Sequence, residues 1–286
     1  MKTLQSLTRV KNRITEIGLH FRKHLLLVLV SALLAGCSLN LVTGRNQLSL
    51  VPESELQLMA SGQYNDFLSE HKVLSANNKD AAMVNRVGAR ISNAITKYYN
   101  NQGQQSVLEG YNWEFNTVDD PAANAWAMPG GKVVVYTGLL PITQTETALA
   151  IVVGHEIAHA IAKHGSERMS QAMVQQLGGM ALQVALSQKP QETQNLFMQA
   201  YGIGSTVGAV LPWSRQQETE ADQYGLIFAA MAGYNPQEAI PFWERMSNAG
   251  GASPPEFLST HPSDETRIRK LKQFMPEAMK YYSKSK

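Results

Sequence analysis

The stretch ETALAIVVGHEIAHAIAKH, which runs from Glu146 to His164, decides the fold. Within it, His155, Glu156 and His159 form the pattern H-E-x-x-H. Residues four positions apart share one face of an α-helix, so both imidazoles can reach a single metal ion. Glu156 lies roughly 100° further round the helix, where a general base must sit to take a proton from zinc-bound water. The pattern therefore predicts a catalytic zinc site.

The residues around this motif are almost all apolar, which indicates that the helix is buried. Two histidines and a carboxylate buried together are costly unless something pairs with them, so metal ligation is favoured over histidines satisfied within a core. Thr143 and Glu146 fit a capping box at the helix start, and Gly165 is expected to end the helix. His164, nine residues after His155, is then expected on the opposite side, away from the metal.

A catalytic zinc ion usually has three protein ligands and one open position for water. The segment Ser214 to Asp222 offers the third ligand. Glu218 and Asp222 are four residues apart on a predicted helix and present two carboxylates on one face. We expect Glu218 to bind the metal and Asp222 to orient a ligand histidine through its other ring nitrogen. Glu220 falls on another face. The alternative is a solvated acidic helix face.

His261 lies in a predicted loop just before the last helix, which is expected from Asp264 to about Met279. A histidine so placed can reach a cleft. There it could donate to the oxyanion of a tetrahedral intermediate, or bind the metal when substrate is absent. Arg267, six residues on, could support it. The alternative is an ordinary surface histidine.

A candidate substrate-binding segment is the extended stretch Asn124, Ala125, Trp126, Ala127 and Met128. It is expected to stop at residue 129, a proline, which cannot donate to a strand ladder. The glycine pair at 130–131 predicts a tight turn into a strand at 132–136. A further strand is expected within 111–118. An edge strand beside a zinc site can bind an extended peptide through main-chain hydrogen bonds. An ordinary hairpin is the alternative.

Helices are also expected at 54–69 and 79–99, for packing, and another from Pro236, capped by Asn235. Two stretches without charged residues, 169–188 and 195–214, follow the zinc helix. Several glutamines in them argue against a membrane span. We expect a helix at 171–186 and then a loop containing Gly202, Gly204 and Gly208. This loop could cover the cleft as a mobile lid, or be a static surface loop.

Residues 1–36 resemble a bacterial lipoprotein signal peptide. Basic residues precede the apolar run 25–34, which is too short to span a bilayer comfortably. The run ends in Leu-Ala-Gly-Cys, similar to a lipobox, which predicts cleavage before Cys37 and a lipid on its sulfur. Cys37 is the single cysteine of the chain, so no intrachain disulfide can form. By resemblance to lipoproteins, Ser38 favours the outer membrane. An uncleaved signal anchor is the alternative.

Together the motifs resemble the gluzincin metallopeptidases, in particular the HtpX and CAAX prenyl endopeptidase type family and its soluble bacterial lipoprotein branch. The resemblance runs from about residue 47 to 272. Besides H-E-x-x-H, it rests on N-A-W-A-M-P-G-G at 124–131, S-R-x-x-E-x-x-A-D at 214–222 and H-P-x-x-x-x-R at 261–267. It implies one Zn²⁺ per chain and the following roles. The metal ligands are His155, His159 and Glu218, the catalytic base is Glu156, and Asp222, His261 and Arg267 lie in the active site.

The resemblance implies hydrolysis of peptide bonds in misfolded or misassembled cell-envelope proteins. It places the protein on the periplasmic side of the outer membrane, anchored by the lipid on Cys37 and near an outer-membrane assembly complex. Two alternatives stay open. One is an assembly or chaperone-like binding factor with rare or gated proteolysis. The other is a zinc hydrolase of another amide, such as one in cell-wall peptide. No transmembrane stretch follows Cys37, so prenyl-peptide processing is not expected.

Composition and length set the remaining expectations. Without residues 1–36 the chain has 19 basic and 22 acidic residues, so nucleic-acid binding has no support. The remaining length suits one domain. We expect a tether at 37–52 and a single metallopeptidase domain at 53–286. The expected fold class is α+β, a mostly helical zincin-like domain with a small β-sheet or hairpin beside the H-E-x-x-H helix.

Overall fold

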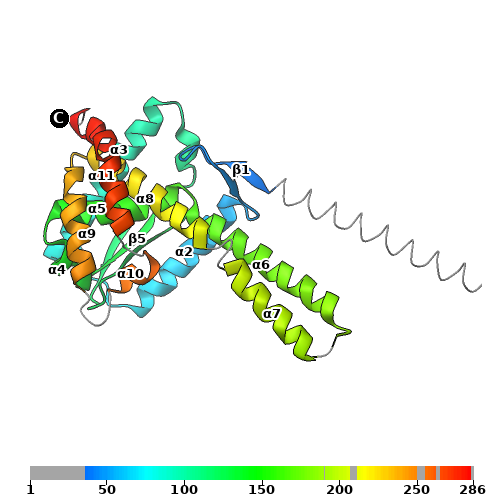
Figure 1. Ribbon diagram of the computed structural model, residues 1–286. Helices are drawn as coiled ribbons and strands as arrows, with labels where there is room; N and C mark the ends of the chain where they lie inside the picture. Colours follow the sequence, from blue (N-terminus) through cyan, green and yellow to red (C-terminus); the bar gives the residue numbers. More distant parts are fainter. Residues whose placement is uncertain (1–35, 190, 207–210, 250–254, 262–264, 285–286) are drawn as a thin grey trace, which may run out of the picture.

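The computed structural model describes residues 36–189, 191–206, 211–249, 255–261 and 265–284 (Figure 1). The predicted signal peptide lies outside this part, except for residue 36, and stays a prediction. Helices form most of the body, a small sheet lies among them, and a two-helix hairpin projects from the body (Figure 1). The α+β, mostly helical fold class is therefore confirmed.

The central sheet has three strands in the order β3-β5-β4. β5 (Lys132–Tyr136) runs parallel to β3 (Glu114–Val118) and antiparallel to β4 (Ala125–Met128). Gly130 and Gly131 form the turn between β4 and β5 with φ of 81° and 85°, a region that glycine enters without steric cost. Among the described strands β4 is at an edge of this sheet, as predicted.

The main core surrounds α5 (Glu146–Ile161), in which every residue from 148 to 161 is buried. The helices α3 (Lys79–Asn101), α8 (Leu211–Met231), α9 (Ala239–Asn248) and α11 (Glu265–Lys284) supply the other large apolar faces of this core. A smaller core lies between the sheet and α2 (Glu53–Glu70). The predicted helices at 54–69 and 79–99 are thus confirmed, and they pack as expected.

Both predicted ends of the zinc helix were wrong. Thr145, not Thr143, is the N-cap and accepts a hydrogen bond from the Ala148 N–H at 3.0 Å. Thr143 is the last residue of a one-turn helix, α4 (Leu140–Thr143), and the chain then turns through a positive φ at residue 144. At the other end Lys163 adopts φ 55°, and a new helix, α6 (His164–Leu186), begins directly after it. Gly165 therefore lies within α6.

The projecting hairpin consists of α6 and α7 (Gln191–Ser205). The predicted glycine-rich loop was wrong, because Gly202 and Gly204 are part of α7; Gly208 lies outside the described residues. Pairing with α6 overrides the low helix propensity of these glycines. For example, the Tyr201 hydroxyl donates to the carbonyl oxygen of Gln175 at 2.8 Å.

The stretch expected to be a tether contains a small hairpin of β1 (Cys37–Leu39) and β2 (Asn46–Leu48). The side chains of Asn40 and Gln47 are buried, and both donate to the carbonyl oxygen of Ala162 at 2.9 Å. The segment is thereby fixed to the end of the zinc helix.

Short elements complete the described chain. They are η1 (Gln105–Leu108), η2 (Thr137–Leu139), η4 (Pro236–Glu238) and α10 (Glu256–Thr260). The Asn235 side chain caps η4 as predicted, accepting from the Gln237 N–H. The last helix begins at Glu265, and Asp264 lies outside the described part. Within the described ranges, no helix combines the length and apolar character needed to cross a bilayer.

Candidate metal centre

Two facing glycines bring the ligand helices α5 and α8 together. A Cβ added to Gly154 of α5 would fall 2.7 Å from the carbonyl oxygen of Gly225, and one added to Gly225 of α8 would fall 2.8 Å from the His155 backbone. Real Cβ atoms do not approach this closely, so only glycine permits the contact. Because the backbones touch at this point, Glu218 on α8 can reach both histidines on α5.

The three predicted metal ligands converge. The Nε2 atoms of His155 and His159 are 3.1 Å apart. The Glu218 carboxylate lies 3.5 Å from His155 Nε2 and 3.3 Å from His159 Nε2. Glu218 keeps a lowered pKa although burial acts to raise it, because it bonds to all the surrounding histidines. The structure thus brings together residues that are 63 positions apart in the sequence.

His261 completes a set of four donors. It directly follows α10 as the C-cap residue, and its Nδ1 lies 3.2 Å from His155 Nε2 and 3.0 Å from Glu218 Oε2. The ligand atoms of His155, His159, Glu218 and His261 all lie within 4.8 Å of one another, and all four residues are buried. Of the two predicted roles for His261, metal binding in the absence of substrate fits this arrangement directly.

Glu156 faces the same cluster. Its Oε1 is buried, lacks a hydrogen-bond partner among the described residues and lies 3.5 Å from His261 Nε2. Burial raises the pKa of Glu156. A buried carboxylate oxygen without a partner is costly. Water or a substrate group at the cluster would satisfy it, which is the position a general base needs.

Asp222 and Arg267 support two of the clustered histidines through hydrogen bonds. Asp222 Oδ1 lies 3.0 Å from His155 Nδ1, in the position expected for orienting that ring. Arg267 donates to both Asp222 oxygens, at 2.8 and 2.7 Å, and to the His261 carbonyl oxygen at 3.1 Å. Its guanidinium lies 3.4 Å from the centre of the Trp243 ring. Arg267 therefore fixes both Asp222, which orients His155, and the backbone of His261.

A second supporting chain was missed in the sequence. His164 Nδ1 lies 2.9 Å from His159 Nδ1, and His164 Nε2 lies 3.0 Å from Glu220 Oε2. Arg45, from the turn of the N-terminal hairpin, bonds both Glu220 and Glu167. His164 was expected not to share the metal, and it is not part of the four-donor cluster. Its expected position on the opposite side of the zinc helix was wrong, because α5 ends before it and α6 begins with it. His164 therefore contacts a ligand, His159, without being one.

One arrangement of protons satisfies the hydrogen bonds of His155 to Asp222 and of His159 to His164. It leaves the Nε2 atoms of His155 and His159 without protons, so that both can bind a cation. His155 Nδ1–H donates to Asp222, His159 Nδ1–H donates to His164, and His164 Nε2–H donates to Glu220. Burial lowers the pKa of His155, but hydrogen bonds to Asp222 and Glu218 outweigh it and raise the pKa to about 9. The surroundings of His155 therefore favour a positive charge at Nε2, which either a second proton or a bound cation supplies.

The donor set fits zinc. Imidazole nitrogens with one carboxylate are ligands that Zn²⁺ takes in proteins, and each ligand histidine has a partner for its other nitrogen. The orphaned Glu156 oxygen lies beside this set. The residues present therefore match a zinc ion that is held by His155, His159 and Glu218, with His261 as a fourth donor.

The predicted substrate segment lies at an edge of the sheet as far as the structure describes it, but its side chains serve packing. Trp126 packs edge-on against Phe67 of α2, with ring centroids 4.9 Å apart. Ala125 is buried in the main core. Asn124 donates to Glu256 of α10, the helix that His261 directly follows. The outer backbone of β4 is thus what remains to meet an extended peptide.

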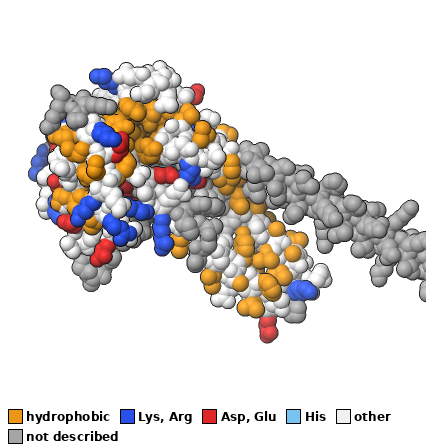
Figure 2. Space-filling model, turned by 45° about the horizontal axis from the view of Figure 1, so that its top comes forward, with side chains coloured by type: hydrophobic (Ala, Val, Ile, Leu, Met, Phe, Trp, Pro, Cys, Tyr) orange, Lys and Arg blue, Asp and Glu red, His pale blue; other side chains and the backbone are white. Residues whose placement is uncertain are grey.

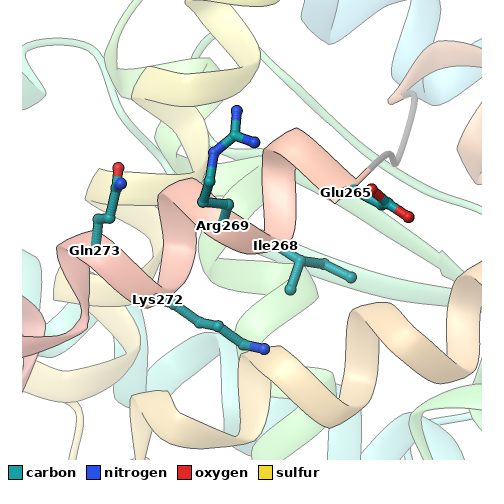
Figure 3. Close-up of a pocket in the computed structure, with 5 residues that line it drawn as sticks. All are labelled: Glu265, Ile268, Arg269, Lys272 and Gln273. Atoms are coloured by element: carbon teal, nitrogen blue, oxygen red, sulfur yellow. The ribbon is translucent and has the colours of Figure 1, made fainter.

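A cavity of about 260 Å³ opens beside the cluster. Its wall includes Glu218, Asp222 and Arg267, together with Leu211 and Arg215 from the start of α8. A larger hollow of about 560 Å³ lies along α11 (Figure 3). Its five lining side chains come from this one helix and do not converge, and none belongs to the metal cluster (Figure 3). The smaller cavity is therefore the candidate active-site cleft.

Comparison with known proteins agrees with this geometry. Residues 86–275 match the model of peptidase family M48, a metallopeptidase family that uses zinc. Mitochondrial metalloendopeptidase OMA1 of Saccharomyces cerevisiae is 37% identical over 63% of this chain and 52% of its own. Human metalloendopeptidase OMA1 is 30% identical over 84% of this chain and 46% of its own. The beta-barrel assembly-enhancing protease of Escherichia coli K12 is 28% identical over 61% and 37%.

The chain spans about half the length of the OMA1 relatives and less of the Escherichia coli protein. The matched region contains the whole predicted ligand set, from His155 to Glu218, and extends past His261 and Arg267. The chain belongs to peptidase family M48.

Proposed function

We propose that this protein is a zinc-dependent endopeptidase. The observation that carries the proposal is the convergence of His155, His159 and Glu218, with the unpartnered Glu156 oxygen beside them. Three protein donors and an adjacent buried base are what metal-assisted peptide hydrolysis needs. The metalloendopeptidases named above support the same reaction class.

The residues have distinct tasks in this reaction. Bound zinc supplies a Lewis acid, which polarises the peptide carbonyl and makes water a better nucleophile. Glu156 accepts the proton of the attacking water and delivers it to the leaving amine. His261 Nε2, 3.5 Å from Glu156, can donate to the developing oxyanion once Nδ1 no longer faces the other ligands. β4 aligns the substrate by main-chain hydrogen bonds.

For the natural substrates, we propose misfolded or misassembled proteins of the cell envelope. The similarity to a beta-barrel assembly-enhancing protease supports substrates among assembling β-barrel proteins, and membrane β-barrels are typical of bacterial outer membranes. Cys37 is exposed at the start of β1, where a lipid on its sulfur would not disturb the fold. This supports a lipid anchor on the periplasmic side of the outer membrane. Wild type grown with labelled palmitate should incorporate the label and Cys37→Ser should not, and an unlabelled wild type would refute the anchor.

A second candidate is an assembly or chaperone-like binding factor whose proteolysis is rare or gated. The observation that favours it is the position of His261. A four-donor protein set is typical of structural zinc, whereas a catalytic zinc keeps an open position. With His261 inside the cluster, the protein can hold zinc and remain inactive until His261 withdraws.

Zinc analysis combined with casein digestion tests the proposal. Wild-type protein should bind one zinc ion and cut casein, while Glu156→Gln should keep the zinc and lose the activity. An active Glu156→Gln protein would refute the role of the base. Wild type that holds zinc, does not cut casein and co-purifies with an envelope complex would favour the second candidate.

A further inference from the structure

The α6–α7 hairpin, which we call the arm, carries an unusual surface. It projects from the body, and hydrophobic side chains gather on it (Figures 1 and 2). No residue of α7 is buried, and the buried residues of α6 are confined to 164–171 at its base. Between residues 169 and 188 no side chain is charged. The arm thus exposes apolar surface over most of its length.

The exposed apolar residues of α6 form one stripe. Met169, Met173, Leu177, Met180 and Val184 follow one another every three or four residues, and their exposure rises from 39% to 74% along the helix. At 100° per residue they fall within an arc of roughly 80°. Such a stripe normally packs against another element, and within the described chain it faces solvent.

α7 lies on a different side of α6 and leaves the stripe free. The contact between the two helices is made at Gly178 and Gly179, which face the Tyr201 ring, and by Tyr201 with Gln175. On a helical wheel these α6 positions are well separated from the stripe. α7 adds exposed apolar residues of its own, Leu196, Phe197 and Ile203. The stripe on α6 is therefore exposed although α6 and α7 pack against each other.

The arm is continuous with the active site at both ends. α6 starts three residues after the zinc helix, and Gln217 of α8 donates to Glu167 at the base of α6 at 2.8 Å. The chain returns into α8, where Leu211 is 43% exposed and lines the same cavity as Glu218. A chain bound along the arm can thus extend to the cleft.

We propose that the arm is a docking site for apolar segments of non-native polypeptide substrates. This rests on the proposed peptidase function and names the site that gives it selectivity. β4 presents mainly backbone to a substrate, because its side chains pack against the two cores, so a second surface that contacts substrate side chains would add selectivity. Methionines adapt to differently shaped apolar partners, and the glutamines between them can bond an unpaired backbone. Two linked sites on one substrate also raise its effective concentration at the cleft.

The test compares an arm variant with a matched control. The arm variant combines Leu177→Gln, Met180→Gln and Val184→Gln, all at exposed positions. The control is Leu58→Gln, a residue that is 75% exposed on α2 and is not part of the arm. Circular dichroism and thermal unfolding verify that both fold. Both are also made with Glu156→Gln, so that binding of fluorescein-labelled casein can be measured without cleavage.

In this background the arm variant should bind casein about tenfold more weakly, and the control should not change. In active enzyme the KM for casein should rise about tenfold with kcat unchanged. Turnover of a short peptide excised from casein, which is too short to reach the arm, should stay the same. The short peptide separates docking from damage to the cleft.

Unchanged casein binding by the arm variant would overturn the proposal. In that case, lost binding to phosphatidylethanolamine–phosphatidylglycerol vesicles would assign the arm to a lipid surface, and lost self-association in sedimentation would assign it to a second copy. Failure of the peptidase function looks different, since wild type would then bind casein through the arm without cutting it.

Discussion

Gly154 and Gly225 let α5 and α8 touch at the backbone, directly beside the ligand His155. The two ligand helices are thus set by main-chain contact and not by adjustable side chains. Protein interiors transmit strain because they are densely packed. A small increase in the spacing of these helices would separate Glu218 from both histidines.

Gly225→Ala should therefore weaken both the fold and the metal site. The added Cβ would lie 2.8 Å from the His155 backbone, and overpacking of this kind costs about 1–3 kcal/mol. Urea unfolding and zinc titration measure the two effects. Gly62→Ala is the control, because no atom lies within 4 Å of its added Cβ in α2, and it should be neutral or stabilising by about 0.5–1 kcal/mol. Equal effects of the two substitutions would contradict the close-contact argument.

His164→Gln should lower zinc affinity without removing a ligand. His164 orients His159 by a hydrogen bond to Nδ1 of His159, the ring nitrogen that does not face the metal site. Loss of such a partner typically costs about 10–100-fold in metal affinity. Competition with a chromogenic chelator measures the affinity. His71→Gln, a change at the end of α2, is the matched histidine control and should leave the affinity unaltered. Wild-type affinity in the His164 variant would show that this contact does not orient the ligand.

Acid should destabilise the protein through Glu220. Burial acts to raise the pKa of the Glu220 carboxyl, but hydrogen bonds from His164 and Arg45 outweigh burial. The net result is a pKa lowered from 4.5 to about 2. Because the folded pKa is below the unfolded value, the carboxylate stabilises the fold above pH 4.5. That contribution is lost as the pH falls from 4.5 towards 2.

Urea unfolding of wild type and Glu220→Gln tests this pH dependence. The difference in unfolding free energy should be large near pH 7 and narrow near pH 3, at about one and a half units below the unfolded pKa. Glu244→Gln, a change at an exposed position of α9, should show little difference at either pH. A difference for Glu220→Gln that is the same at both pH values would argue against the shifted pKa.

Zinc should stabilise the folded protein, since a ligand that binds only the native state raises its stability. Chelation should lower the midpoint of thermal unfolding of wild type, and added zinc should restore it. Glu218→Ala should lose most of this response, because it lacks the carboxylate between the two histidines. A full zinc response in that variant would place the metal elsewhere.

Local spacing made the ligands of the site predictable. H-E-x-x-H and the Glu218–Asp222 pair each lie within one helical turn, so helix geometry alone groups them. The role of His164 was not predictable in this way. It depends on a left-handed residue, Lys163, and neither glycine nor proline marks that position. The position of this turn becomes visible only in the structure, where α5 ends at Ile161 and Lys163 precedes α6.

The same distinction applies to the fold. The edge strand and its Gly130-Gly131 turn follow from local rules, and the structure confirms them. α7 was missed because glycines have low helix propensity, which contact with α6 outweighs. The N-terminal hairpin had a local sequence signal in Gly44, a glycine between two short runs of polar and apolar residues. In the structure Gly44 forms part of the turn with a φ of 67°. Its attachment to Ala162, more than 110 residues away, had none.

In the chain the arm follows one ligand helix, α5, and precedes the other, α8. The helices on either side of the arm, α5 and α8, pack against each other at Gly154 and Gly225. This packing does not involve the distal part of the arm. Such an arrangement tolerates insertion and exchange, because loops and projections change more easily than the scaffold that carries them. Descendants of one ancestral enzyme could thus acquire new targets by rewriting this segment, while inheriting their chemistry intact.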